Sequence, residues 1–280
     1  MTRVRVSKLL ALLGGDRRRG WLRTKPPASS EGAVLGARDH VNVYADPTHL
    51  SWHELTFTLT LELPRLMAHA KVSGVVCSHG EDGSRDPTVF ARLGDVARGL
   101  HSVGRLDAAS EGLLILTDDG ALSQRLTHPR FAVPRTYVVG LARAADEQAL
   151  AALRAGRLAL RDGHRPHPSI LEEIPPDDAL LACPRWPFTG AQQWWRVGLN
   201  EGKYHEVRRM FAACGSHVVA LRRIAYGGVS LPADTEPGAL WSLSDVQREA
   251  LYAQVGLRPA LSRVVLRCGT RGDIVGVVEA

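Results

Sequence analysis

Alternating and periodic apolar positions divide most of the chain into short strands and helices. The segment 53–63, HELTFTLTLEL, alternates well enough to be a strand with one apolar face. Apolar runs bounded by turn residues predict further strands within SEGLLILTDDG, RTYVVGLAR, QQWWRVGLNEG and SHVVALRRIAYGGVSL. Helical periodicity with a terminal Gly or Pro predicts helices in VRVSKLLALL (4–13), in DDGALSQRLTHP, over 145–156, in YHEVRRMFAACG and in LSDVQREALYAQVGL. Helices inserted between short strands are typical of the α+β class.

Size and charge narrow the range of partners. The chain has 280 residues, of which 45% are hydrophobic, so it can form one large domain or two smaller ones with a real core. Its net charge of +6 makes nucleic acid the first interpretation of its partner, while an acidic protein or an ordinary soluble surface remains an alternative.

Several classes of site are absent from the sequence. The four cysteines form no CxxC pair and are interpreted as reduced thiols, so neither a zinc site nor any other metal site is expected. There is no phosphate loop, no GxGxxG, no HExxH and no GxSxG motif, so no cofactor is predicted. No apolar run reaches the roughly 18 residues of a membrane helix, so no membrane partner is expected. His164 and His167 are assigned to a surface loop.

The first thirty residues are unusual in composition. They are rich in Arg, contain Asp16 as their only acidic residue, and end in Pro and Ser. Such a segment suits an organellar transit peptide, a basic RNA-binding arm or a small helical module, and the sequence leaves these open.

Two motifs could carry chemistry. Asp107 follows Gly104-Arg105-Leu106 and precedes a small-residue turn into the apolar run Leu113–Leu116. On spacing alone, the more frequent explanation is an ion pair at a strand edge, and the alternative is a nucleophile on a rigid element. Tyr137 begins a strand, where it can pack against the core or offer its ring to an unstacked base.

A third segment is basic. EGKYHEVRRMF, 201–211, places Lys203, His205, Arg208 and Arg209 at a helix start, which suits phosphate groups as well as a solvated charged face. Arg208 and Arg209 lie about 100° apart on a helix, so one can enter a cleft while the other does not.

In chain order these motifs resemble the pseudouridine synthases of the RsuA/RluB/RluE/RluF type, which isomerise single uridines in ribosomal RNA. The likeness covers residues 64–252. The resemblance is found in five segments: KVSGVVCSHGEDGSRDPTVFARL, GRLDAASEGLLILTDDGALSQRLTHP, RTYVV, EGKYHEVRRMFAACGSHVVALRRIAYGGVSL and PGALWSLSDVQREAL. Long matches at separated sites are far more specific than one short pattern.

The resemblance implies an α+β fold with a mixed, mostly antiparallel central sheet, flanking helices and an RNA-binding cleft. It implies catalysis by Asp107 at the sugar, with Arg208 paired to it and Tyr137 stacked on the flipped uracil. It also implies an enzyme without metal or redox cofactor, acting on ribosomal RNA or a pre-ribosomal particle, on the small subunit, as a monomer. The basic residues expected to contact RNA are Lys71, Arg105, Lys203, His205, Arg209 and Arg222.

The same likeness suggests three parts: a basic segment over 1–52, a catalytic domain over 53–255 and a C-terminal extension over 256–280. The first motif has Lys71-Val72-Ser73-Gly74 where the family usually has Lys-Pro-x-Gly. The first part is either a degenerate S4-like module or a transit peptide. The compartment is accordingly the cytoplasm of a bacterium, or a mitochondrion or plastid. A non-catalytic ribosome-assembly factor that kept the fold is the alternative function.

Overall fold

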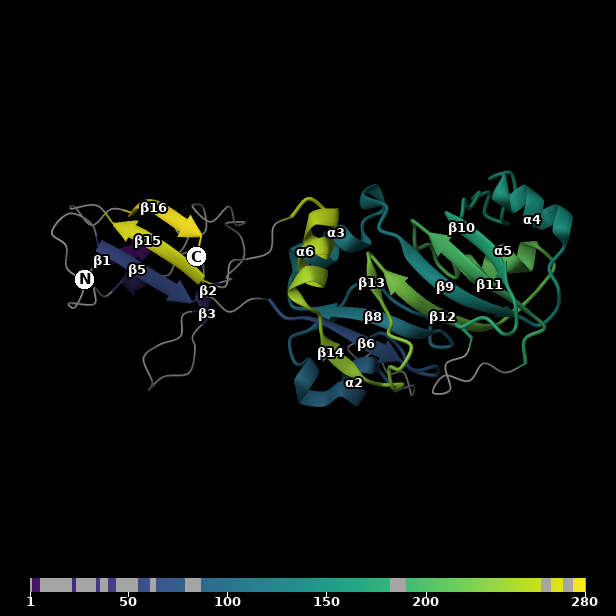
Figure 1. Cartoon of the computed structure of the whole chain (residues 1–280), viewed down its shortest axis with the longest axis horizontal. Helices are drawn as coiled ribbons and strands as arrows, with labels where there is room; N and C mark the ends of the chain where they lie inside the picture. The colour runs from purple at the N-terminus through teal and green to yellow at the C-terminus, as the bar shows by residue number, and fades with distance from the viewer. Residues whose placement is uncertain are drawn as a thin grey trace. The chain divides into compact units, whose positions relative to one another are not determined.

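The computed structural model describes residues 64–78, 87–181 and 190–257 in full, and outside them the backbone of seven short strand segments. The chain divides into two compact units (Figure 1). One comprises Met1–Pro64 and Pro259–Ala280, and the other Arg65–Arg258.

The described part of the first unit consists of paired strands. β1 (Thr2–Arg5) pairs with β4 (His40–Val43), β2 (Leu22–Arg23) pairs with β3 (Val34–Leu35), and β5 (Leu55–Thr60), β15 (Arg263–Cys268) and β16 (Ile274–Glu279) form an antiparallel sheet in the order β16-β15-β5. The strand expected over 53–63 is therefore present as β5, in this unit, and the C-terminal segment pairs with it. The helix expected over 4–13 overlaps β1 at its first two residues and otherwise lies outside the described residues, as does most of the proposed S4-like or transit segment.

The second unit is built on a nine-stranded mixed sheet. The main path runs β10-β11-β9-β12-β8-β6-β14, with β13 beside β12 and β7 beside β8. The strands are β6 (Leu66–Lys71), β7 (His101–Ser102), β8 (Glu111–Thr117), β9 (Arg135–Leu141), β10 (Ile170–Ile174), β11 (Gln193–Leu199), β12 (Val218–Tyr226), β13 (Val229–Ser230) and β14 (Leu240–Ser242). Of these pairings only β8 with β12 is parallel. The predicted α+β fold with a mostly antiparallel sheet is confirmed.

Helices cover the sheet, and several of them begin at a capping side chain (Figure 1). They are α2 (Val89–Leu93), α3 (Gly120–Thr127), α4 (Glu147–Arg154), α5 (Glu206–Ala213) and α6 (Asp245–Gln254), with short 3-10 turns η2 (Gly94–Ala97) and η3 (Pro129–Phe131). The side chains of Asp119, Asp146 and Ser244 accept hydrogen bonds from the first turns of α3, α4 and α6, which satisfies backbone N–H groups that have no partner inside the helix. In the described part of the chain, no helix is long and apolar enough to cross a bilayer.

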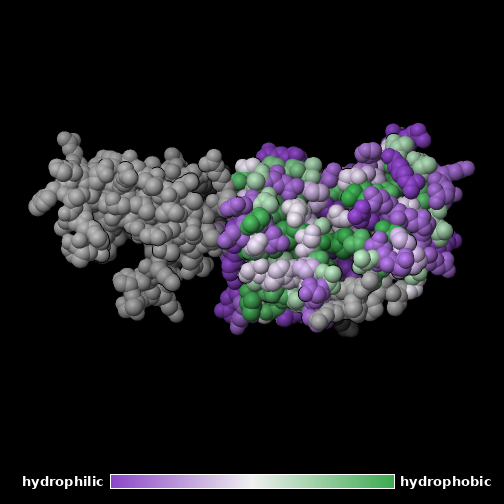
Figure 2. Space-filling view, in the orientation of Figure 1, coloured by the Kyte–Doolittle hydropathy of each residue, from purple (hydrophilic) through white to green (hydrophobic). Residues whose placement is uncertain are grey.

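Two cores lie on opposite faces of the sheet. Leu150 of α4 and Phe211 of α5 belong to the larger one, and Leu122 of α3 and Tyr252 of α6 to the other. Adjacent residues of β8 alternate between these cores, so the strand is buried on both sides. Hydrophilic residues cover much of the face of this unit that Figure 2 shows.

Candidate active site

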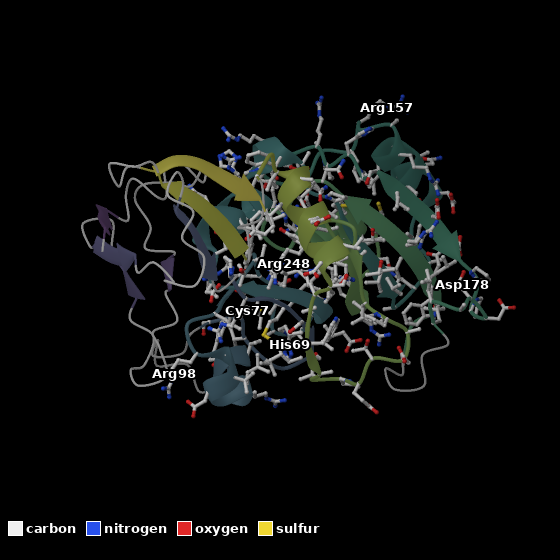
Figure 3. The ribbon with its side chains drawn as sticks, turned by 60° about the vertical axis from the view of Figure 1, so that its left-hand side comes forward. His69, Cys77, Arg98, Arg157, Asp178 and Arg248 are labelled. Carbon is white, nitrogen blue, oxygen red and sulfur yellow. The ribbon has the colours of Figure 1, made fainter. Side chains whose placement is uncertain are left out.

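Asp107 lies in the loop between β7 and β8, at the edge of a pocket of about 270 Å³. Its side chain is 34% exposed. The turn that follows is closed by a hydrogen bond from the Ser110 N–H to the Asp107 carbonyl at 3.0 Å. Before it, the Leu106 N–H donates to Sγ of the buried Cys77, at 3.5 Å; Figure 3 labels Cys77. The carboxylate is thus carried by a closed turn whose entry is hydrogen-bonded to Cys77.

Lys71 connects this loop to β6 through three hydrogen bonds. It ends β6, its exposed fraction is 0%, and its ammonium donates to the carbonyls of Asp107, Ala108 and Ser110 at 3.1, 3.2 and 2.6 Å. Burial lowers the pKa of Lys71 to about 8, against the pull of Cys77 and Asp107, which favours the charged form. The prediction that Lys71 contacts RNA is wrong, because a fully buried ammonium cannot reach a phosphate. Its place is under the loop that carries Asp107.

Register places four residues in one row across the sheet. Lys71 of β6 lies opposite Gly112 of β8, Gly112 opposite Arg223 of β12, and Arg223 opposite Tyr137 of β9. Side chains of directly opposed residues leave the sheet on the same face. Gly112 has φ +101°, and a Cβ atom there would lie 2.3 Å from the Arg223 carbonyl oxygen, so this row closes only around glycine.

The pocket brings together the three predicted catalytic residues from separate segments. Asp107 comes from the β7–β8 loop, Tyr137 from β9 and Arg208 from α5, and all three line it. Tyr137 is only 9% exposed and lies opposite Arg223, so its ring forms part of the pocket wall. A deep aromatic surface beside a carboxylate suits an unstacked base held with its sugar toward the carboxylate.

The partner of the Asp107 carboxylate differs from the predicted one. Arg208 donates from its guanidinium to the carbonyls of Ala109 at 3.1 Å and Val218 at 3.0 Å. The described side-chain partner of the Asp107 carboxylate is His205, whose Nε2 lies 3.4 Å from Oδ1. Arg208 therefore clamps the loop two residues beyond Asp107 to β12, and among the described contacts it makes no ion pair with the carboxylate.

A partly buried cluster of His164, two glutamates and Lys203 holds the segment that leads into α5. His164 Nε2 lies 3.0 Å from Glu206 Oε1 and 3.1 Å from Glu201 Oε1, while Lys203 Nζ lies 2.7 Å from His164 Nδ1. Because a lysine ammonium only donates, Nδ1 accepts and Nε2 carries the proton toward the carboxylates. Burial raises the pKa of Glu206, although its bonds to His164 and the Lys203 N–H oppose this. The assignment of His164 to a surface loop is wrong, since its side chain is 13% exposed and fully engaged.

These three ligand-type residues, His164, Glu201 and Glu206, are the one group in the described residues that could hold a metal ion. Their hydrogen bonds to one another and to the Lys203 ammonium already account for the arrangement. The cluster is therefore interpreted as an anchor for the loop.

The remaining basic candidates lie in three different settings: the pocket, the protein surface and the protein interior. Arg105 is exposed and lines the pocket. Arg209 lies outside the pocket lining and pairs with Asp162 at 2.5 Å, so of the two neighbouring arginines Arg208 enters the pocket. Arg222 is 3% exposed and donates to Glu111 Oε1 at 2.7 and 2.9 Å. The prediction that Arg222 contacts RNA is wrong, because its guanidinium is committed to this pair.

Ser110 and Arg223 were not among the predicted site residues, yet both line the pocket and both are buried. Ser110 Oγ and Arg223 Nη2 have no hydrogen-bond partner in the described part of the structure. Buried polar atoms without partners are rare, and in a pocket they suit a polar ligand. Strand alternation at Arg222-Arg223 indicates that the two arginines face opposite ways, but the sequence does not show which of them faces the pocket.

Comparison with known proteins gives relatives of one kind. The family described as RNA pseudouridylate synthase matches residues 65–213. The ribosomal small subunit pseudouridine synthase A of Escherichia coli (strain K12) is 36% identical over 183 residues, covering 65% of this chain and 71% of that protein. The ribosomal large subunit pseudouridine synthase B of Salmonella typhi is 35% identical over 209 residues, covering 73% and 65%. Among solved structures, a crystal structure of a pseudouridylate synthase has a TM-score of 0.56 and 28% identity, covering 89% of this chain and 99% of that one.

Proposed function

The chain belongs to the RNA pseudouridylate synthase family, and on that premise we propose that it isomerises uridine to pseudouridine at specific positions of ribosomal RNA. Relatives that are named for ribosomal subunits and cover about two thirds of the chain support this substrate. The observation that carries the proposal is the convergence of Asp107, Tyr137 and Arg208, from three separate segments, on one pocket.

The reaction breaks the C1′–N1 glycosidic bond, turns the uracil, and joins C5 to C1′. The C5 proton leaves, N1 ends protonated, and the product is an isomer of the substrate, so atoms and electrons balance without an oxidant or reductant. Asp107 acts at the sugar, either as nucleophile at C1′ or by removing a proton at C2′. Both routes need its carboxylate ionised and aimed, and the loop contacts of Lys71 and Arg208 hold it in place.

Tyr137 stacks on the flipped uracil and assists proton transfer at C5. Taking the base out of its stack costs a few kcal/mol, which contacts between basic groups and the flanking phosphates offset. Arg105 at the pocket and the net charge of +6 support such contacts.

Three finer proposals concern the subunit, the oligomeric state and the compartment. We place the target in the small subunit because the segment KYHEVRRMFAACGSHV resembles the small-subunit branch of the family. We propose that the protein acts in the cytoplasm of a bacterium, as the named relatives are bacterial, and that it is a monomer, as the resemblance to the family implies. A transit peptide in the first 52 residues would instead direct the protein to a mitochondrion or plastid.

The test is release of tritium from [5-³H]uridine in unmodified small- and large-subunit rRNA transcripts. Wild type should release tritium from one of them, and Asp107→Asn should not while still binding the RNA. Asp245→Asn, at an exposed carboxylate on α6, is the matched control and should keep wild-type release. Equal release by wild type and Asp107→Asn would remove Asp107 from the mechanism. Tight RNA binding without release by any variant would favour the assembly-factor alternative.

A further inference from the structure

Tyr204 is an exposed aromatic residue in the lining of the pocket. Its exposed fraction is 71%, and in the described part of the chain it is the one aromatic side chain among the large exposed hydrophobics, beside Val96, Val219 and Val246. A single exposed apolar residue is ordinary on a protein surface. Tyr204 differs from the three valines because it lines the same pocket as Asp107.

One face of the Tyr204 ring is already stacked. Its centroid lies 3.8 Å from that of His205, with 16° between the planes, and this is the ring contact described for it. With most of the side chain exposed, the opposite face is open to solvent. His205 takes a left-handed backbone conformation, φ +50°, which is uncommon for a residue with a side chain and is found more often at functional sites.

The backbone around this stack is fixed. The Glu206 carboxylate accepts from the Lys203 N–H at 3.0 Å, and His164 contacts both Glu206 and the Lys203 ammonium. The stack also reaches the catalytic loop, because His205 Nε2 lies 3.4 Å from Asp107 Oδ1. A ring held in this way binds a flat partner with little loss of conformational entropy.

Positive charge accompanies the open ring face. Arg105 is exposed in the same lining, and the Lys203 side chain is 47% exposed. Aromatic rings for bases combined with cations for phosphates are how proteins hold single-stranded nucleic acid. We propose that the open face of Tyr204 stacks on a nucleobase next to the target uridine, with the adjoining phosphate at Arg105. This rests on the proposed function, since the pocket must receive the uridine.

The experiment measures binding of the seven-nucleotide RNA AAAUAAA at low ionic strength by fluorescence anisotropy. Six further probes each replace one adenosine by an abasic ribose. Tyr204→Ala should weaken binding of the intact RNA about 5- to 150-fold, the range for loss of one base–aromatic stack. At one abasic position the wild type should lose affinity and become equal to Tyr204→Ala, because the base that Tyr204 stacks on is then missing.

Matched variants separate the stack from other causes. Tyr204→Phe keeps the ring and should bind like wild type, and Val246→Ala, at another exposed apolar residue, should change nothing. Three results would overturn the inference. Tyr204→Ala could bind AAAUAAA as tightly as wild type, or the wild type could lose the same affinity at every abasic position. The third is that wild type does not bind AAAUAAA at all.

Tritium release keeps this result apart from the proposed function. Release by wild type with the same KM in Tyr204→Ala would overturn the stacking role and leave the proposed function standing. If wild type shows the position-specific loss of binding but releases no tritium, the stacking contact stands and the proposed function is overturned.

Discussion

Asp107 Oδ1 lies 3.4 Å from His205 Nε2, and the two side chains come from segments almost one hundred residues apart in the chain. Both side chains are about one third exposed. Arg208, the expected partner of Asp107, instead grips the backbone of the same loop through the Ala109 carbonyl. Orientation of the carboxylate therefore depends both on a partly exposed contact with the His205 ring and on backbone contacts to the loop.

Replacing His205 by Gln should have a small effect. Even as a charged pair, a partly exposed contact of this kind contributes only about 0.2–1 kcal/mol, so kcat/KM should fall no more than about fivefold. The measurement is the rate of tritium release at several RNA concentrations. A loss of a hundredfold or more would contradict this and would give His205 a direct part in the chemistry.

Arg208→Lys should be more damaging although it keeps the charge. Lysine cannot span the carbonyls of Ala109 and Val218 with the two arms of a guanidinium, so one charge-assisted bond is lost. Such a bond contributes about 1.5–3 kcal/mol, and kcat should fall about 10- to 150-fold with the RNA dissociation constant little changed. Arg209→Lys is the matched control, since Arg209 lies outside the pocket lining; kcat values equal to wild type in both variants would refute the clamp.

Lys71 should make stability depend on pH in an identifiable way. Its pKa is lowered from 10.5 to about 8 by burial, so below pH 8 both folded and unfolded chains hold the proton and the cost of burying the charge is fully present. Between pH 8 and 10.5 the unfolded chain binds more protons, and the contribution of Lys71 to the free energy of unfolding rises by up to about 3 kcal/mol. Denaturant unfolding of wild type and Lys71→Met at pH 7 and pH 10 checks this. The difference between the two proteins should shift in favour of wild type at pH 10, and a constant difference would contradict the prediction.

Gly112→Ala should destabilise the second unit severely. The added Cβ would lie 2.3 Å from the Arg223 carbonyl oxygen, which is backbone in the middle of the sheet. Gly238→Ala is the control, because Gly238 also has a positive φ but nothing within 4 Å of its Cβ position. Thermal and denaturant unfolding should show a loss of about 1 kcal/mol for Gly238→Ala and more than about 3 kcal/mol for Gly112→Ala. Equal losses would mean that the sheet moves apart to accept the methyl group.

The sequence by itself determined several elements of the second unit and the motif residues of the pocket. The apolar run in RTYVVGLAR and the periodicity in YHEVRRMFAACG are local properties, so β9 and α5 were predictable within a few residues. The motif around Asp107 likewise identified a pocket residue, since its context is contiguous in the chain.

Only the tertiary structure decided which charges face the pocket. Lys71 and Arg222 are basic motif residues like Arg105, and the sequence does not distinguish the three. Strand pairing buries Lys71 under the Asp107 loop and Arg222 against Glu111. His164 joins Glu206 across 42 positions, and Arg223 meets Tyr137 across β12 and β9. Whether a charged side chain is buried or paired depends on which segments lie side by side in space. Local sequence patterns do not show those neighbours, because strand pairing in the folded sheet sets them.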